Sequence, residues 1–225
     1  MQIDPETRHR HLEETALRLR NEGYGVEWQN GERLIVSHEN GMLCTVDNPG
    51  GISYRQVDMS CPEIVEAKDH AFSIVRQVAE YMRNMDRAPV LKVTGVEDKY
   101  KLLAEFNGTV LAGMQTKYGV NFVTWDRDFN YEGLSHGHYY ASDYEGAKKD
   151  FATRSGLISK NMLFEKNQMV EIYRCCADAL AGEYEISGEQ GATIRSIQDQ
   201  IEDVYPEILD EITAQNQDNE PQMNM

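Results

Sequence analysis

The chain has 225 residues, 40% of them hydrophobic, and a formal net charge of −16 at pH 7. This length allows one or two domains with a sizeable core. The sequence has no apolar run long enough to cross a bilayer, and its first residues show no hydrophobic signal region, so we expect a cytoplasmic location. The four cysteines are too few and too scattered for a disulfide framework, and we expect them to be reduced.

Most of the charge imbalance lies in the last third of the chain. Residues 161–225 hold 14 acidic side chains and 3 lysines or arginines, a net charge of −11, whereas residues 91–160 hold 9 of each. Because neutralising phosphates requires Lys and Arg, we do not expect the acidic region to bind nucleic acid directly. Its field would attract a partner with a basic surface, although acidity can also serve only to keep a protein in solution.

Residues 1–88 predict an α-β-meander-α domain. Asp4 and Pro5 form a typical helix start, and Gly23 ends this first helix. Turn signals such as Asn30-Gly31 then separate four expected strands, at residues 24–28, 33–38, 42–46 and 52–56. A helix from about residue 61 to residue 84 completes the domain. We expect the first helix to have a buried face formed by Leu12, Ala16 and Leu19, and two solvated histidines, His9 and His11.

Residues 89–212 predict a second β-meander followed by three helices, and residues 213–225 predict a disordered acidic and polar tail. The expected strands are residues 90–94, 100–106, 109–116, 120–125 and 136–140, and the main expected helices are residues 142–155, 166–180 and 187–204. Asn107-Gly108 is expected to form a hairpin turn, and Ser187 and Gln190 a capping box. A short helical stretch at residues 207–212 follows Pro206. The predicted fold class is therefore α+β: two small antiparallel β-meander sheets, each packed with helices, and a C-terminal helical region.

The segment from Gly137 to Leu157 joins the last strand to a helix with complete end signals. Ser142 and Glu145 form a capping-box pattern, and Gly156 is placed to end the helix. Two acid-first pairs at i, i+4 are expected on the exposed face, and one of them joins Asp150 to Arg154.

Residues 91–209 resemble an uncharacterised family encoded on conjugative and other mobile elements of Firmicutes, especially gut clostridia. The matching text includes YKLLAEFNGTVLAG (residues 100–113), TKYGV (116–120), FVTW (122–125), GHYY (137–140) and DFATRSGL (150–157). The resemblance implies an accessory protein of a mobile element and no established activity. Small acidic proteins are frequent among inhibitors of restriction and CRISPR nucleases, which makes an anti-defence role an analogy of context and charge.

His136 and His138 are the sharpest candidates for chemistry. Residues at i and i+2 of a strand project to the same face, so both imidazoles are expected to be able to share one divalent metal. Asp143, or an acid in the loop at residues 126–132, is the candidate third ligand. Two histidines are half a site, and surface or hydrogen-bonding roles remain the alternative.

Other catalytic patterns are weak. Cys44 and Cys61 could lie near His38 or His70, but nothing in the sequence orders them into a triad. Asn48-Pro49-Gly50-Gly51 lacks the residues of a phosphate loop. The segment at residues 150–157 faintly resembles a helix-turn-helix, beside a basic group formed by Lys148, Lys149, Arg154 and Lys160. We therefore assign no catalytic residues.

The sequence favours a non-catalytic acidic interaction protein of a mobile element, with inhibition of a host defence nuclease as the specific hypothesis. The carboxylates expected to contact a basic, nucleic-acid-binding surface are Glu183, Glu185, Glu189, Asp199, Glu202, Asp203, Glu207, Asp210 and Glu211. A metal-binding protein or metal-dependent enzyme centred on His136 and His138 is one alternative. A DNA-binding accessory factor of conjugation is another.

Overall fold

The structure is a computed structural model, which describes residues 4–39, 41–55, 61–96, 99–159, 163–182 and 185–218. Within these residues the chain forms two four-stranded antiparallel sheets and six helices. The predicted α+β class is confirmed. The chain divides into two compact units, Met1–Ile158 and Ser159–Met225.

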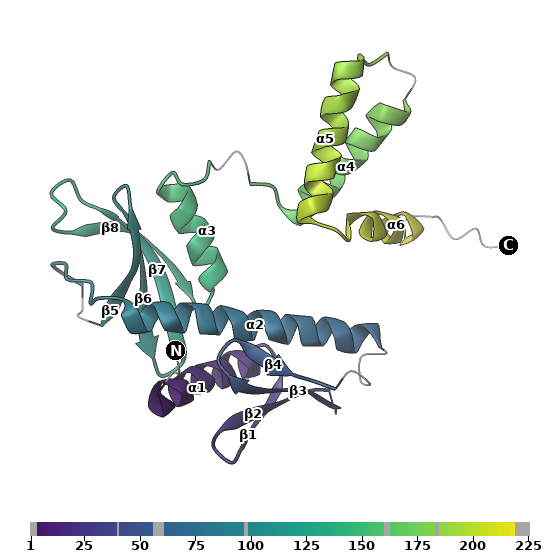
Figure 1. The fold of residues 1–225 in the computed structure, drawn as a ribbon. Helices are drawn as coiled ribbons and strands as arrows, with labels where there is room; N and C mark the ends of the chain where they lie inside the picture. The colour runs from purple at the N-terminus through teal and green to yellow at the C-terminus, as the bar shows by residue number, and fades with distance from the viewer. Residues whose placement is uncertain are drawn as a thin grey trace. The chain divides into compact units, whose positions relative to one another are not determined.

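The first sheet is a meander with one helix before it and one after it (Figure 1). Its elements are α1 (Pro5–Asn21), β1 (Gly25–Gln29), β2 (Arg33–His38), β3 (Gly41–Asn48), β4 (Gly51–Ser53) and α2 (Pro62–Arg87). Asn30 and Gly31 have φ angles of 55° and 72°, the left-handed values that a tight hairpin turn requires. All four predicted strands are present, and β4 is shorter than expected.

The second sheet is also a meander, and a helix follows it. Its elements are β5 (Tyr100–Phe106), β6 (Thr109–Thr116), β7 (Gly119–Arg127), β8 (Leu134–Ala141) and α3 (Tyr144–Arg154). The strand predicted at residues 90–94 is wrong, because only Val90 forms an isolated bridge, to Lys101. Leu91 instead packs with Val110 and Trp125 in a small core on one face of the sheet.

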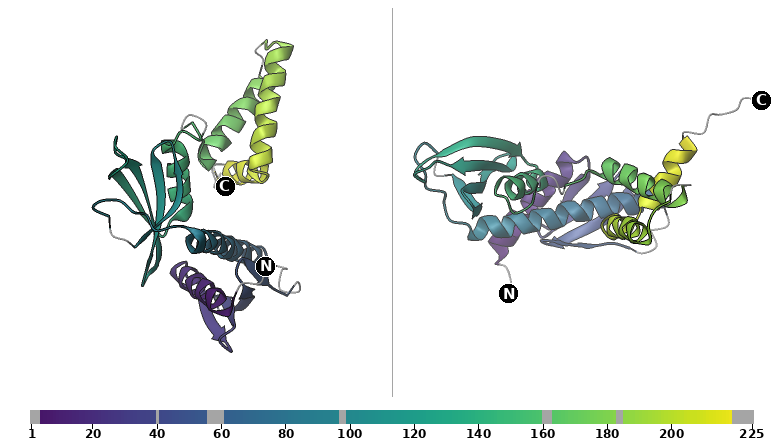
Figure 2. Two further views of the ribbon diagram at one scale, coloured as in Figure 1. Left: turned by 60° about the vertical axis from the view of Figure 1, so that its left-hand side comes forward. Right: turned by 90° about the horizontal axis from the view of Figure 1, so that it is seen from above.

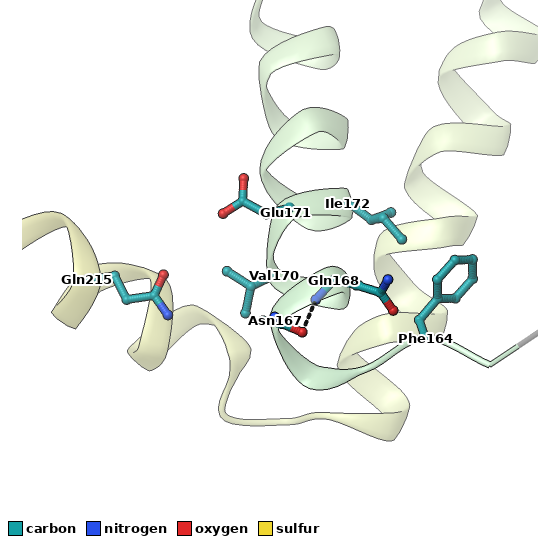
Figure 3. Close-up of a pocket in the computed structure, with 7 residues that line it drawn as sticks. All are labelled: Phe164, Asn167, Gln168, Val170, Glu171, Ile172 and Gln215. Carbon is teal, nitrogen blue, oxygen red and sulfur yellow. Dashed lines mark hydrogen bonds between the residues drawn. The ribbon is translucent and has the colours of Figure 1, made fainter.

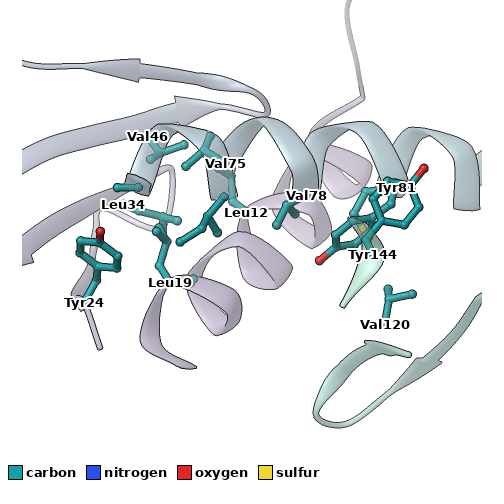
Figure 4. Packing of buried hydrophobic residues seen from close by; sticks show 14 of the residues in the cluster. Leu12, Leu19, Tyr24, Leu34, Val46, Val75, Val78, Tyr81, Val120 and Tyr144 are labelled. Carbon is teal, nitrogen blue, oxygen red and sulfur yellow. The ribbon is translucent and has the colours of Figure 1, made fainter. Parts of the chain in front are cut away.

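Helix α2 joins both sheets to one core. It has 26 residues, which makes it about 39 Å long, and it lies beside α1 (Figures 1 and 2). One cluster of buried side chains contains Leu34 of β2, Val75 of α2 and Val120 of β7 (Figure 4). The predicted domain boundary after residue 88 therefore lies inside the first unit. The periodicity of apolar residues indicates that one face of α2 is buried, but it does not show that both sheets pack against that helix.

A buried carboxylate connects α1 to the second sheet. Glu14 is 4% exposed, and it accepts hydrogen bonds from the Tyr81 hydroxyl at 2.8 Å, the Val120 amide at 3.0 Å and the Gln115 side-chain amide at 3.2 Å. We call these four residues the Glu14 cluster. Burial and the neighbouring Glu14 carboxylate raise the pKa of Tyr81 far above its usual value, so its hydroxyl remains a donor. The three donors compensate for burying the acid.

The polar face of α1 was not expected from the sequence. His11, predicted to be solvated, is 1% exposed, and its Nε2 lies 2.7 Å from Asp86 Oδ2. Arg18 is also buried and donates to the Ser142 carbonyl at 2.6 Å. Residues 11, 14 and 18 are spaced by three and four, so they share one helix face. The apolar spacing predicted only the hydrophobic part of the buried surface. That part is confirmed, because Leu12, Ala16 and Leu19 are all buried.

The second unit is helical within the residues that the structure describes. It contains α4 (Lys166–Ala181), α5 (Gly188–Val204) and α6 (Ile208–Asp218). Its buried core comprises Val170, Tyr173, Ile201, Tyr205 and Ile208. The structure assigns residues 213–218, the first part of the tail predicted to be disordered, to α6, and residues 219–225 lie outside the described residues. Gln215 accepts a hydrogen bond from Arg174 of α4 at 3.0 Å and holds this polar segment in place.

Helix ends follow the sequence closely, with one correction. Asp4 caps α1, and Ser187 forms the predicted capping box with Gln190. At α3 the cap is Asp143 rather than Ser142, and Asp143 accepts from the Gly146 amide at 2.8 Å. Either residue type suits this position, so the pattern alone could not choose between neighbours.

No helix in the described ranges combines the length and apolar character needed to cross a membrane.

Candidate functional site

His136 and His138 lie on β8, where the strand is irregular. Thr124 pairs with His138 and Asp126 pairs with Ser135, so His136 and Gly137 together oppose a single residue of β7. His136 has a φ angle of 49°. This bulge interrupts the i, i+2 alternation from which a shared face for the two imidazoles was predicted.

Each histidine lies beside a different carboxylate. His138 Nδ1 is 3.2 Å from both carboxylate oxygens of Asp150 on α3, whereas His136 Nδ1 is 3.9 Å from Asp126 Oδ2 on β7. Arg154 joins the two halves: its Nη2 is 2.6 Å from Asp126 Oδ2, and its Nη1 is 3.5 Å from Asp150 Oδ2. We call these residues, together with Thr124, the β8–α3 network.

Hydrogen bonds and neighbouring charges in this network stabilise the ionised form of Asp150. Thr124 donates a hydrogen bond to Asp150 and accepts one from Arg154 at 2.9 Å. Burial alone would raise the pKa of Asp150, but hydrogen bonds from Thr124 and His138, with the charges of His138 and Arg154, outweigh it and lower that pKa. Burial, and then the Asp150 charge, raise the pKa of Tyr140 to about 12. Asp150 is therefore a stable anion beside an imidazole.

The described residues contain no group of three or more His, Cys, Asp or Glu side chains placed to hold a metal ion. Asp143, a candidate third ligand, caps α3, and Asp126 is paired with Arg154. His138 keeps a half-exposed ring whose Nδ1 faces a carboxylate. That orientation, common in metal-binding and proton-transferring histidines, leaves Nε2 as the atom able to bind a ligand or exchange a proton.

Sequence reasoning placed Asp150 and Arg154 on an exposed helix face and so missed the network. Both side chains are instead covered by β7 and β8, with about one sixth of their surface exposed. Their position next to the buried Phe151 was the available signal. The spacing of apolar residues does not predict which polar residues beside the apolar face of a helix will be covered by a sheet.

The basic group predicted around α3 is partly neutralised. Lys148 lies 3.2 Å from Glu80 and 2.8 Å from Glu145, and Arg154 is held by two aspartates. Lys160 lies outside the described residues. At least two of the four cations are thus engaged within the protein, which weakens the case for phosphate binding here.

The predicted partner-binding acids fall into two groups. Glu202 accepts from the Tyr173 hydroxyl at 2.5 Å, and Glu211 contacts Tyr205 and lies 2.7 Å from Lys166 Nζ. The exposed members, which have no ion pair within the part of the second unit that the structure describes, are Glu185, Glu189, Asp199, Asp203, Glu207 and Asp210. Glu183 lies outside the described residues.

A concave site in the second unit offers little chemistry. Its volume is about 510 Å³, and Gln215 of α6 lies across the opening from Val170 and Glu171 of α4 (Figure 3). Among the described residues that line it, Glu171 is the single ionisable one, and it is paired with Arg174 at 2.8 Å. The lining therefore lacks a pair of groups suited to acid–base catalysis.

The cysteines show no nucleophilic arrangement in the described chain. Burial raises the pKa of the Cys44 thiol to about 11, which keeps it protonated near neutral pH. His70 Nδ1 lies 2.8 Å from the Tyr24 hydroxyl, and the His38 ring packs against the same tyrosine. Cys61 contacts Glu63 rather than a base that would activate it as a nucleophile.

Comparison of the chain with protein-family models, curated protein sequences and solved structures gave no match.

Proposed function

We propose that the chain is a non-catalytic interaction protein of a mobile genetic element, whose acidic second unit binds a basic surface on a protein partner. The specific partner is a nucleic-acid-binding nuclease of host defence, blocked by occlusion of its basic surface. The mobile-element context rests on the resemblance of residues 91–209 to a family of such elements.

The supporting observation is the set of six exposed carboxylates on and beside α5 and α6 that form no ion pair with a described residue of the second unit. Folded proteins commonly intersperse both signs of charge on their surfaces. Here the described residues of the second unit include three cations, Lys166, Arg174 and Arg195, and two of them pair internally with Glu211 and Glu171. The remaining field is strongly negative, which favours encounter with a positive surface and disfavours nucleic acid.

Affinity capture from a Firmicutes host lysate, with and without nuclease treatment, identifies the partner, and binding is then measured with the purified protein. The test variant carries Asp199→Lys, Asp203→Lys and Glu207→Lys. We expect it to lose at least about 100-fold in affinity, mainly through a slower association rate, because three attractive charges become repulsive. Binding of the unmodified chain should weaken as salt is raised.

The matched control carries Glu22→Lys, Glu27→Lys and Glu32→Lys, which change net charge equally but lie on the first unit, where all three are exposed. It should retain affinity within about threefold, since net charge alone is not the proposed determinant. Equal losses of affinity in both variants would mean that binding depends on the net charge of the chain rather than on the acidic surface of the second unit. Unchanged affinity in the test variant would exclude the acidic surface as the contact.

The second candidate function is metal binding at His138, favoured by the Asp150 carboxylate that orients its ring. Elemental analysis of the purified protein and its melting temperature with and without a chelator test this directly. A His138→Gln variant should lose the metal if the site exists. Metal-free protein with a chelator-independent melting temperature would eliminate it.

A further inference from the structure

An exposed aromatic group lies at one end of the second sheet. In the loop between β7 and β8, Phe129 is 99% exposed and Tyr131 is 61% exposed. Phe106, at the end of β5, is 50% exposed. In an antiparallel meander the β5–β6 turn and the β7–β8 loop lie at the same end, so two connections supply these rings. We call the three residues the aromatic end.

The loop that carries Phe129 is tied down by its own backbone. Asp128 donates its amide to the Gly133 carbonyl at 3.1 Å, accepts from the Tyr131 amide at 3.1 Å through its carbonyl, and accepts from the Glu132 amide at 2.9 Å through its carboxylate. Tyr131 has a φ angle of 61°, a left-handed conformation that needs such support. The ring of Phe129 is thus presented by an ordered turn.

The loop is also fixed to its neighbour. The Arg127 amide donates to the Gly108 carbonyl at 2.7 Å, which joins the β7–β8 loop to the β5–β6 turn. Arg127 makes a two-pronged contact with Glu105, at 2.9 and 2.8 Å. An ordered loop backbone reduces the entropy lost on binding, and aromatic residues are typical of the energetically dominant positions at protein interfaces.

We propose that the aromatic end docks into an apolar pocket with a basic rim on a protein partner, with Phe129 as the central anchor. The charges of the loop indicate a basic rim on the partner. Asp128 and Glu132 lie on either side of Phe129 in the sequence, and Arg127, at the start of the loop, is already neutralised by Glu105. This surface belongs to the first unit, whereas the acidic helices belong to the second, so the proposal does not depend on the proposed function.

The same charges argue against other occupants. Stacking on single-stranded nucleic acid uses aromatics in a positively charged groove, and this loop carries acids instead. Aromatic loops also insert into membrane interfaces, but Asp128 and Glu132, in a chain of net charge −16, would be repelled by anionic lipid surfaces.

The test uses the full chain with the photoreactive residue p-benzoylphenylalanine at position 129, irradiated in a lysate of the organism that encodes it. The matched control places it at position 118, because Tyr118 is 68% exposed but lies at the opposite end of the sheet, in the β6–β7 turn. The crosslinked peptide is identified by mass spectrometry, and the purified partner is then titrated with unlabelled variants.

Support requires a crosslink specific to position 129, on a partner peptide that lines an apolar pocket flanked by Lys or Arg. Phe129→Ala must also weaken binding of that purified partner by at least about 30-fold, the loss expected for a buried aromatic anchor, while Tyr118→Ala changes it less than about twofold. Asp128→Ala, which loosens the loop but keeps the ring, should give an intermediate loss.

The proposal is overturned by any of four results. These are the absence of a crosslink, equal labelling from position 118, a product containing nucleic acid, lipid or a second copy of this chain, and retention of partner affinity by Phe129→Ala. Because Phe129 is nearly fully exposed, its replacement should leave the melting temperature unchanged, so loss of binding is not a folding effect.

Discussion

At the scale of single residues, Glu14 is the side chain on which the first unit depends most. Replacing it with Ala would leave two buried donors, the Tyr81 hydroxyl and the Val120 amide, without their acceptor. It would also remove the hydrogen bond from the side-chain amide of the exposed Gln115. We expect Glu14→Ala to lower the free energy of unfolding by about 3 kcal/mol. Urea unfolding followed by tryptophan fluorescence measures it.

Two variants separate this effect from general changes in α1. Glu13→Ala removes an exposed neighbour and should change stability by less than about 0.5 kcal/mol. Tyr81→Phe removes one hydrogen bond to Glu14 and should cost about 1 kcal/mol. Additive effects of Glu14→Ala and Tyr81→Phe in the double variant would show that the two groups do not interact.

Asp150 gives a prediction for pH. Its pKa in the folded state is lowered from 3.8, so its contribution to stability is present above that value and is lost as pH falls below it, through the folded-state pKa. We expect Asp150→Asn to make the fall in unfolding free energy below pH 4 shallower than in the unmodified chain. Urea titrations at a series of pH values measure both profiles.

Thr124→Val is the matched variant for this prediction. It keeps the shape of the side chain and removes its hydrogen bond to Asp150, which helps to lower the pKa of that carboxyl. The acid-induced loss of stability should then be smaller, and complete at a higher pH, than in the unmodified chain. Superimposable profiles for all three proteins would mean that Asp150 does not contribute to the pH dependence.

At the scale of elements, the bulge in β8 requires glycine. A Cβ on Gly137 would lie 2.6 Å from Trp125 Nε1 and 3.1 Å from the Tyr139 ring. We expect Gly137→Ala to destabilise the first unit by about 2 kcal/mol, through forced shifts in packing. Gly51→Ala is the control, since its Cβ would meet only an oxygen at 4.0 Å. Equal stability of both variants would argue against the bulge geometry.

Elements were the level at which sequence reasoning worked best. Asn30-Gly31, Asn107-Gly108 and the caps at Asp4 and Ser187 each specify local backbone geometry, and each is where the sequence places it. The bulge in β8 was not predicted because it depends on how β8 pairs with β7, and the sequence of a single strand does not specify that pairing. The β8–α3 network was missed for the same kind of reason: it depends on which side of α3 meets β7.

At the scale of the whole molecule, the predicted division after residue 88 differs from the observed units because α2 and Glu14 link both sheets. Such links join residues about 100 positions apart, and no local pattern reports them. The acidic C-terminal helices were recognised from charge and periodicity alone, because neither depends on distant partners.

The two units should unfold separately. Both tryptophans, Trp28 and Trp125, belong to the first unit, whereas the second unit has a small core of its own. We expect Ile208→Ala, at a fully buried position, to destabilise the second unit by about 3 kcal/mol. The change should appear in the helical circular dichroism signal and leave the tryptophan fluorescence transition unmoved. A shift of both signals together would mean that the units unfold as one.

The hydrogen bond between Glu14 and Val120 spans 106 positions of sequence. During synthesis, α1 emerges from the ribosome long before the strand that supplies its amide partner. The carboxylate must therefore stay hydrated, and α1 cannot take its final place, until β7 has been made. A fragment that begins after α2 would contain the second sheet without the two helices that complete its core.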